Sequence, residues 1–139
     1  MVDASVAIKW YLPEPHDVNA GRLLQAAGEG EVSLHVPDLF FTEVGNILWK
    51  RVRWGELSLD RASRIPGLLA SVSKRVHGTE SYFGAALELA CWSGQTVYDC
   101  AYLVLAASLE CQMATADERL IRALAGTKWR NIPLWIGDY

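Results

Sequence analysis

Four acidic residues of this chain have side chains and positions suited to binding a metal ion. Each lies where a predicted strand or loop passes into a helix, or inside an apolar helix: Asp3, Glu43, Asp99 and Asp117. In a parallel α/β fold, such positions meet at the carboxyl edge of the sheet. Four carboxylates there repel one another, and each pair at about 5 Å costs roughly 3 kcal/mol at an effective dielectric near 20. A cation must therefore offset their charge.

The available side chains indicate which cation this is. No lysine stands beside any of the four acids, and only Arg119 is close to one in the sequence. The three histidines, His16, His35 and His77, have no ligand spacing, and we expect them at the surface or in structural roles. Hard oxygen ligands without a histidine and cysteine set favour Mg²⁺ or Mn²⁺ over zinc. The sequence therefore predicts a site for one of these two ions.

Three of the four acids, taken singly, also have a structural explanation. Asp3 and Asp117 could cap the helices that follow them, and Thr96 with Asp99 resembles a capping box. Glu43 has no such role, because its apolar neighbours direct it toward the interior, where an unpaired charge is costly. Capping therefore explains single acids but not four acids that converge on one edge of the sheet.

The elements that would position these acids alternate between helical periods and short apolar runs, which is the α/β pattern. We expect helices at 5–11, 17–27, 39–54, 59–76, 79–92, 97–109 and 117–125. We expect strands at 1–2, 32–36, 111–115 and 131–136, with a further short strand at 75–77. The sheet should be parallel or nearly so, and the helix at 97–109 should be buried.

Composition supports one globular domain over residues 1–139, since 51% of the residues are hydrophobic and 21% are charged. A net charge of -3 argues against a pervasive basic surface, although it leaves room for a local patch at Lys50, Arg51 and Arg53. The cysteines lack C-x-x-C spacing, and we expect reduced core residues: Cys91, Cys100 and Cys111. With no membrane-length apolar run and no signal pattern, the expected location is the cytoplasm.

In order and spacing, and over the whole chain, the four acidic segments resemble the PIN-domain proteins, and specifically the VapC-type ribonuclease toxins of bacterial and archaeal toxin–antitoxin pairs. The matching segments are Val2-Asp3-Ala4-Ser5, Glu43 with Asn46, Tyr98-Asp99-Cys100-Ala101-Tyr102-Leu103 and Thr115-Ala116-Asp117-Glu118-Arg119-Leu120. One departure is that only Met1 and Val2 precede the first acid, where family members usually carry several apolar residues. The first strand should therefore be very short. A trimmed or misassigned N-terminus is one explanation for this departure.

The resemblance implies a three-layer α/β sandwich with a central, mostly parallel sheet flanked by helices. It also implies an Mg²⁺- or Mn²⁺-dependent endoribonuclease that acts as the toxin of a toxin–antitoxin system. Asp3, Glu43, Asp99 and Asp117 would then be the catalytic and metal-binding acids. Ser5, Asn46 and Thr115 would orient those acids or contact the substrate. The implied partners are RNA, a cognate antitoxin protein and a second copy in a homodimer, with no membrane.

Functions of other classes fit the sequence less well. A phosphoacceptor receiver domain requires paired acids and a lysine at the end of a late strand. An aspartyl-phosphate phosphatase requires the motif Asp-x-Asp. Here Ala4-Ser5 follows Asp3, and Thr115-Ala116 precedes an aspartate. The stronger alternative is a catalytically silent PIN-like module that binds RNA or a partner, and the presence of all four acids counts against it. Cleavage that EDTA abolishes would separate the two.

Six tryptophans are many for a chain of this length. Trp10, Tyr11, Trp49 and Trp54 fall in the N-terminal half, near the predicted helices that carry Asp3 and Glu43. Large aromatic side chains usually pack in the core. The alternative is a groove that receives an apolar helix of the antitoxin.

Overall fold

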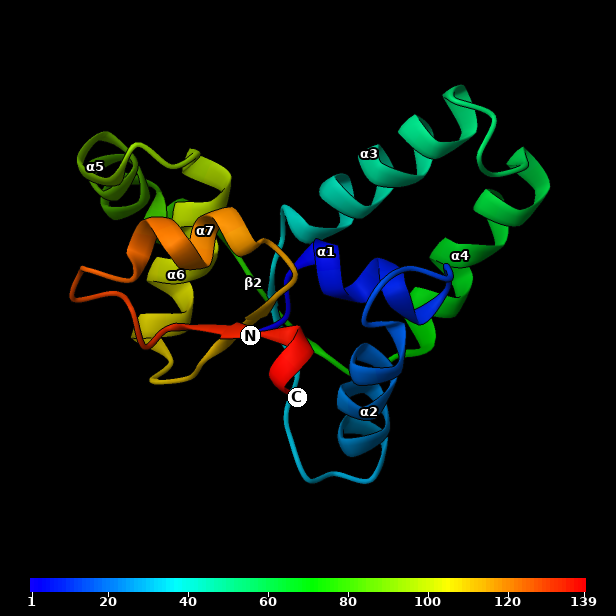
Figure 1. Ribbon diagram of the computed structural model, residues 1–139, viewed down its shortest axis with the longest axis horizontal. Coiled ribbons are helices and arrows are strands. Elements are labelled where there is room, and N and C mark those ends of the chain that lie inside the picture. The colour runs from blue at the N-terminus through cyan, green and yellow to red at the C-terminus, as the bar shows by residue number, and fades with distance from the viewer.

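The structure is a computed structural model that describes residues 1–139, in which helices surround short parallel strands (Figure 1). The helices are α1 Ala4–Ala7, α2 Asp17–Gly28, α3 Phe40–Arg53, α4 Leu59–Ser71, α5 Phe83–Ser93, α6 Val97–Ser108 and α7 Glu118–Leu124. The strands are β1 His35–Pro37, β2 Arg75–His77, β3 Met113–Thr115 and β4 Pro133–Trp135. Single 3₁₀ turns occur at η1 Ile8–Trp10, η2 Glu80–Tyr82 and η3 Ile136–Asp138. The predicted α/β class is confirmed.

The N-terminal residues join two pairs of parallel strands. β1 pairs with β2, and β3 pairs with β4. Between them, Val2 forms a parallel bridge with Ala114, and its amide donates to the His35 carbonyl at 3.0 Å. The Asp3 amide donates to the Ala114 carbonyl, also at 3.0 Å. The order is therefore β2, β1, residues 1–3, β3 and β4, and the very short first strand ends directly at Asp3.

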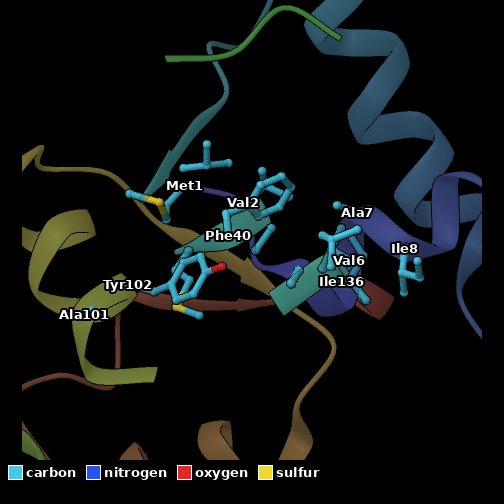
Figure 2. Packing of buried hydrophobic residues seen from close by; sticks show 14 of the residues in the cluster. Met1, Val2, Val6, Ala7, Ile8, Phe40, Ala101, Tyr102 and Ile136 are labelled. Carbon is cyan, nitrogen blue, oxygen red and sulfur yellow. The ribbon is translucent and has the colours of Figure 1, made fainter. Parts of the chain in front are cut away.

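Two groups of helices flank these strands in Figure 1, with α5, α6 and α7 on one side and α1 to α4 on the other. The segments that carry the acids meet over one hydrophobic core of 32 buried residues. Val2, Phe40 of α3 and Tyr102 of α6 lie together in that core (Figure 2). None of the helices has the length and apolar character needed to cross a membrane.

Several predicted boundaries were wrong. The helix expected at 59–76 ends at Ser71, because the backbone becomes extended at Val72 and then forms β2. The helix expected at 5–11 is divided into α1 and η1, and the one expected at 79–92 begins with the turn η2. Cys91 is exposed, which contradicts the expected core position, whereas Cys100 is buried. α6 is buried over most of its length, but its residue Tyr98 is 63% exposed.

Candidate metal centre

The fold places the four acids close enough to repel one another. Asp3 ends the first strand, Glu43 and Asp99 lie in the first turns of α3 and α6, and Asp117 precedes α7. Asp3 interacts electrostatically with both Glu43 and Asp99, and Asp99 interacts with Glu43 and Asp117. Each of the four acids therefore lies within electrostatic range of at least one other.

Two hydroxyl groups hold the Asp3 carboxylate and tie it to the segment that carries Asp117. Ser5 Oγ and Thr115 Oγ1 each donate a hydrogen bond to Asp3 Oδ2 at 2.7 Å. Ser5 Oγ also accepts from the Ala116 amide at 3.0 Å, and Thr115 Oγ1 accepts from the Asp117 amide at 3.1 Å. Thr115 is fully buried, so this arrangement is fixed by the core. Ser5 and Thr115 thus lie where they can orient an acid.

Capping explains part of the geometry. Asp117 caps α7, since its Oδ1 accepts from the amides of Arg119 and Leu120 at 2.8 and 3.2 Å. This leaves Oδ2 for another ligand. The cap of α6 is Thr96, whose hydroxyl accepts from the Asp99 amide at 3.1 Å and donates to Asp99 Oδ2 at 2.6 Å. Asp99 is therefore held by the cap and is not itself the cap.

Glu43 has a partner that the sequence reasoning missed. The Tyr102 hydroxyl donates to Glu43 Oε2 at 2.5 Å, and the Tyr102 ring is almost completely buried. A tyrosine inside an apolar helix needs a partner for its hydroxyl, and Tyr102 lies one turn after Asp99. That need was a usable signal for a polar group nearby. The identity of the partner depends on the packing of α3 beside α6, which is not a local feature.

The acids carry charge that no basic side chain neutralises. Burial raises the pKa of Asp3 and of Asp99, and repulsion from neighbouring acids adds to the rise. Burial also raises the pKa of Glu43 to about 7, despite the opposing effect of the Tyr102 hydrogen bond. None of the ion pairs in the structure includes one of the four acids. A bound cation would relieve this repulsion.

The donor set suits Mg²⁺ or Mn²⁺ held partly through water. No three acidic, histidine or cysteine side chains stand at the spacing of a ready-made cage. Mg²⁺ usually keeps several waters and takes only one or two carboxylates directly, which matches oxygen ligands spread over four elements. The two half-buried histidines do not contribute, because His35 Nδ1 and His77 Nε2 lie 2.9 Å apart and bond to each other. Asn46 is exposed on α3, and its predicted role stays a prediction.

The hydrogen bond from the Thr115 hydroxyl to Asp3 leads to a first testable prediction about metal binding. We expect Thr115→Val to weaken Mg²⁺ binding about 10- to 100-fold, the usual loss when a group that orients a metal ligand is removed. Valine leaves Asp3 Oδ2 without one of its donors and the Asp117 amide without its acceptor. The measurement is the Mg²⁺ concentration that gives half of the thermal stabilisation. Thr115→Ser keeps the hydroxyl and should restore binding, whereas equal weakening in both variants would indicate a packing effect.

Both the sequence and the fold of this chain are similar to those of known proteins. Residues 1–125 match the family model described as the PIN domain. Ribonuclease VapC3 of Pyrobaculum aerophilum is 38% identical over 122 residues, which cover 86% of this chain and 90% of that protein. The crystal structure of PAE2754 from Pyrobaculum aerophilum matches with a TM-score of 0.70 at 26% identity, over 95% of this chain and 81% of that chain.

Proposed function

This chain belongs to the PIN-domain family, and from that membership we propose that it hydrolyses RNA phosphodiester bonds as the VapC-type toxin of a toxin–antitoxin pair. The observation that carries the proposal is a group of four acids, each of which repels at least one other and none of which forms an ion pair. The similarity to a ribonuclease over most of the chain supports the same activity. We also infer the three-layer PIN arrangement, with helices on both faces of the strands.

Asp3, Asp99 and Asp117 are the proposed ligands of Mg²⁺ or Mn²⁺. Such an ion, when bound, neutralises charge on the phosphate oxygens and makes a bound water more acidic. Ser5 and Thr115 orient Asp3 Oδ2, and Thr96 orients Asp99 Oδ2.

Glu43 is the proposed general base. The Tyr102 hydroxyl occupies its Oε2 and leaves Oε1 to take the proton of the attacking water. A pKa of about 7 suits this role at neutral pH. Attack of water on phosphorus breaks the bond to the 3′ oxygen, so the products carry a 5′-phosphate and a 3′-hydroxyl.

The surface of α3 and α4 is the proposed binding site of the antitoxin. Trp10 and Tyr11 pack against the core, and the Trp10 indole donates to the Ala20 carbonyl at 2.9 Å. Trp49 and Trp54 are instead 54% and 65% exposed, so core packing does not account for them. A cleft of about 160 Å³ between α3 and α4 lies on the same helix pair. An apolar helix of the antitoxin would cover this surface.

We further propose that the protein forms a homodimer. Size-exclusion chromatography with light scattering tests this by measuring the mass of the particle in solution.

We expect Mg²⁺ or Mn²⁺ to stabilise the fold. A ligand that binds only the native state at ten times its Kd contributes about 1.4 kcal/mol, or about 5 °C for a domain of this size. The test is a thermal scan in EDTA and in rising millimolar concentrations of each ion. Asp60→Asn is the matched control, because Asp60 is an exposed acid on α4 that pairs with Arg64, and its shift should equal the wild-type shift. A melting temperature insensitive to both ions would contradict a metal site.

A further inference from the structure

An uncharged groove of about 520 Å³ opens beside the metal centre. It lies between α5 and the first turns of α6. Its walls are apolar apart from two threonines and a tyrosine, and its main lining side chains are Leu39, Thr79, Phe83, Thr96 and Tyr98. No acidic or basic side chain lines it, so it is not suited to bind a phosphate group.

The groove adjoins the segments that carry two of the acids, Asp99 and Glu43. Its wall includes Thr96, whose hydroxyl donates to Asp99 Oδ2 at 2.6 Å. Leu39, on another wall, directly precedes α3, whose first turn carries Glu43. A molecule that occupies the groove therefore lies next to the carboxylates proposed to act on the scissile phosphate.

Two aromatic rings stand exposed in this groove. Phe83 is 61% exposed and Tyr98 is 63% exposed, although both neighbour apolar side chains. Exposed aromatic rings next to an apolar floor are the usual platform for unpaired nucleic-acid bases, because every base has a flat face that stacks. The threonine hydroxyls offer hydrogen bonds to the polar edge of a base.

We propose that this groove binds an unpaired base of the RNA next to the cleaved bond, stacked on Tyr98 and Phe83. This assignment rests on the proposed ribonuclease function and adds the part of the substrate that the metal centre does not contact. The acids and their cation act on the phosphate, and the uncharged groove holds the base. The enzyme would thereby prefer single-stranded RNA, since a paired base cannot enter.

The test combines variants of the groove with RNA that lacks single bases. Short labelled single-stranded RNAs are made intact and with one base removed at each position near the cleaved bond. Tyr98→Ala should raise KM for intact RNA about 5- to 150-fold, the loss of one base–aromatic stack, with little change in kcat. Tyr98→Phe keeps the ring and should behave as wild type. Trp92→Ala is the matched control, because Trp92 is 62% exposed on α5 but lines a different cavity.

The decisive result is a double-mutant cycle. On the RNA that lacks the stacked base, Tyr98→Ala should have no further effect. An equal effect of Tyr98→Ala on every RNA would overturn the proposal. A change of mass in light scattering that accompanies the loss of activity would also overturn it, and would make the groove a contact between protein chains. If the wild type cleaves no RNA, the ribonuclease function fails. The same cycle measured as binding, by fluorescence anisotropy, then still decides the base site.

Discussion

An Asp99→Asn variant of this protein is expected to lose RNA cleavage to background while melting at or above the wild-type temperature in EDTA. Asparagine keeps the side-chain shape and an oxygen that can accept the Thr96 hydroxyl, which Asp99 accepts at 2.6 Å. The cap of α6 also survives, because Thr96 provides it. What disappears is a negative charge that repels Glu43 and Asp117 and that the proposed cation requires.

Cleavage of an end-labelled RNA with Mg²⁺, together with thermal melting of the same preparations, measures this prediction. Asp60→Asn serves as the control, since it makes the same chemical change at an exposed acid of α4. Wild-type activity in Asp99→Asn would leave Asp99 with a structural role only.

A Glu43→Gln variant is expected to separate catalysis from stability. Activity should fall by about two orders of magnitude or more, the usual loss with a general base. The metal-free protein should be at least as stable as wild type at pH 7, because burial and repulsion from Asp3 and Asp99 disfavour the charge of Glu43. The glutamine oxygen can still accept the Tyr102 hydroxyl bond. If Glu43 were instead paired with a buried cation, the change would cost about 3 to 5 kcal/mol.

The pH dependence of stability provides a second readout of the same variant. Because burial raises the pKa of Glu43 to about 7, the folded protein holds a proton that the unfolded chain releases near its ordinary value of about 4.5. The metal-free wild type should therefore lose stability as pH rises from about 4.5 to 7. The raised pKa values of Asp3 and Asp99 act in the same direction. Urea unfolding at several pH values should show a shallower decline in Glu43→Gln, and an unchanged decline would contradict the charged environment of Glu43.

The gathering of the acids could be predicted because it follows from local order along the chain. Asp3 ends the first strand and Asp117 follows β3, and parallel strands bring their carboxyl ends to one edge. The capping box of Thr96 with Asp99 was also predicted from a local pattern, and the Thr96 side chain caps α6 by accepting from the Asp99 amide. The order of the elements and the capping residues were sufficient for these features.

Features that depend on contacts distant in sequence could not be predicted. The strand at 75–77 was predicted, but the apolar pattern through Val76 also continues the helical period of α4, so the sequence did not place the end of that helix at Ser71. α5 is apolar on most of its circumference, so its periodicity did not reveal that Cys91 faces outward. The bond from Tyr102 to Glu43 joins residues 59 positions apart.

The central claim is metal-dependent hydrolysis of RNA by the four acids, and end mapping of cleaved RNA tests it most directly. Purified wild-type protein should cut single-stranded RNA in Mg²⁺ or Mn²⁺, stop in EDTA and resume when excess Mg²⁺ is restored. The fragments should carry a 5′-phosphate and a 3′-hydroxyl, the ends that remain when water attacks phosphorus and the 3′ oxygen leaves. Cleavage that persists in EDTA, or fragments that end in a 2′,3′-cyclic phosphate, would contradict this assignment.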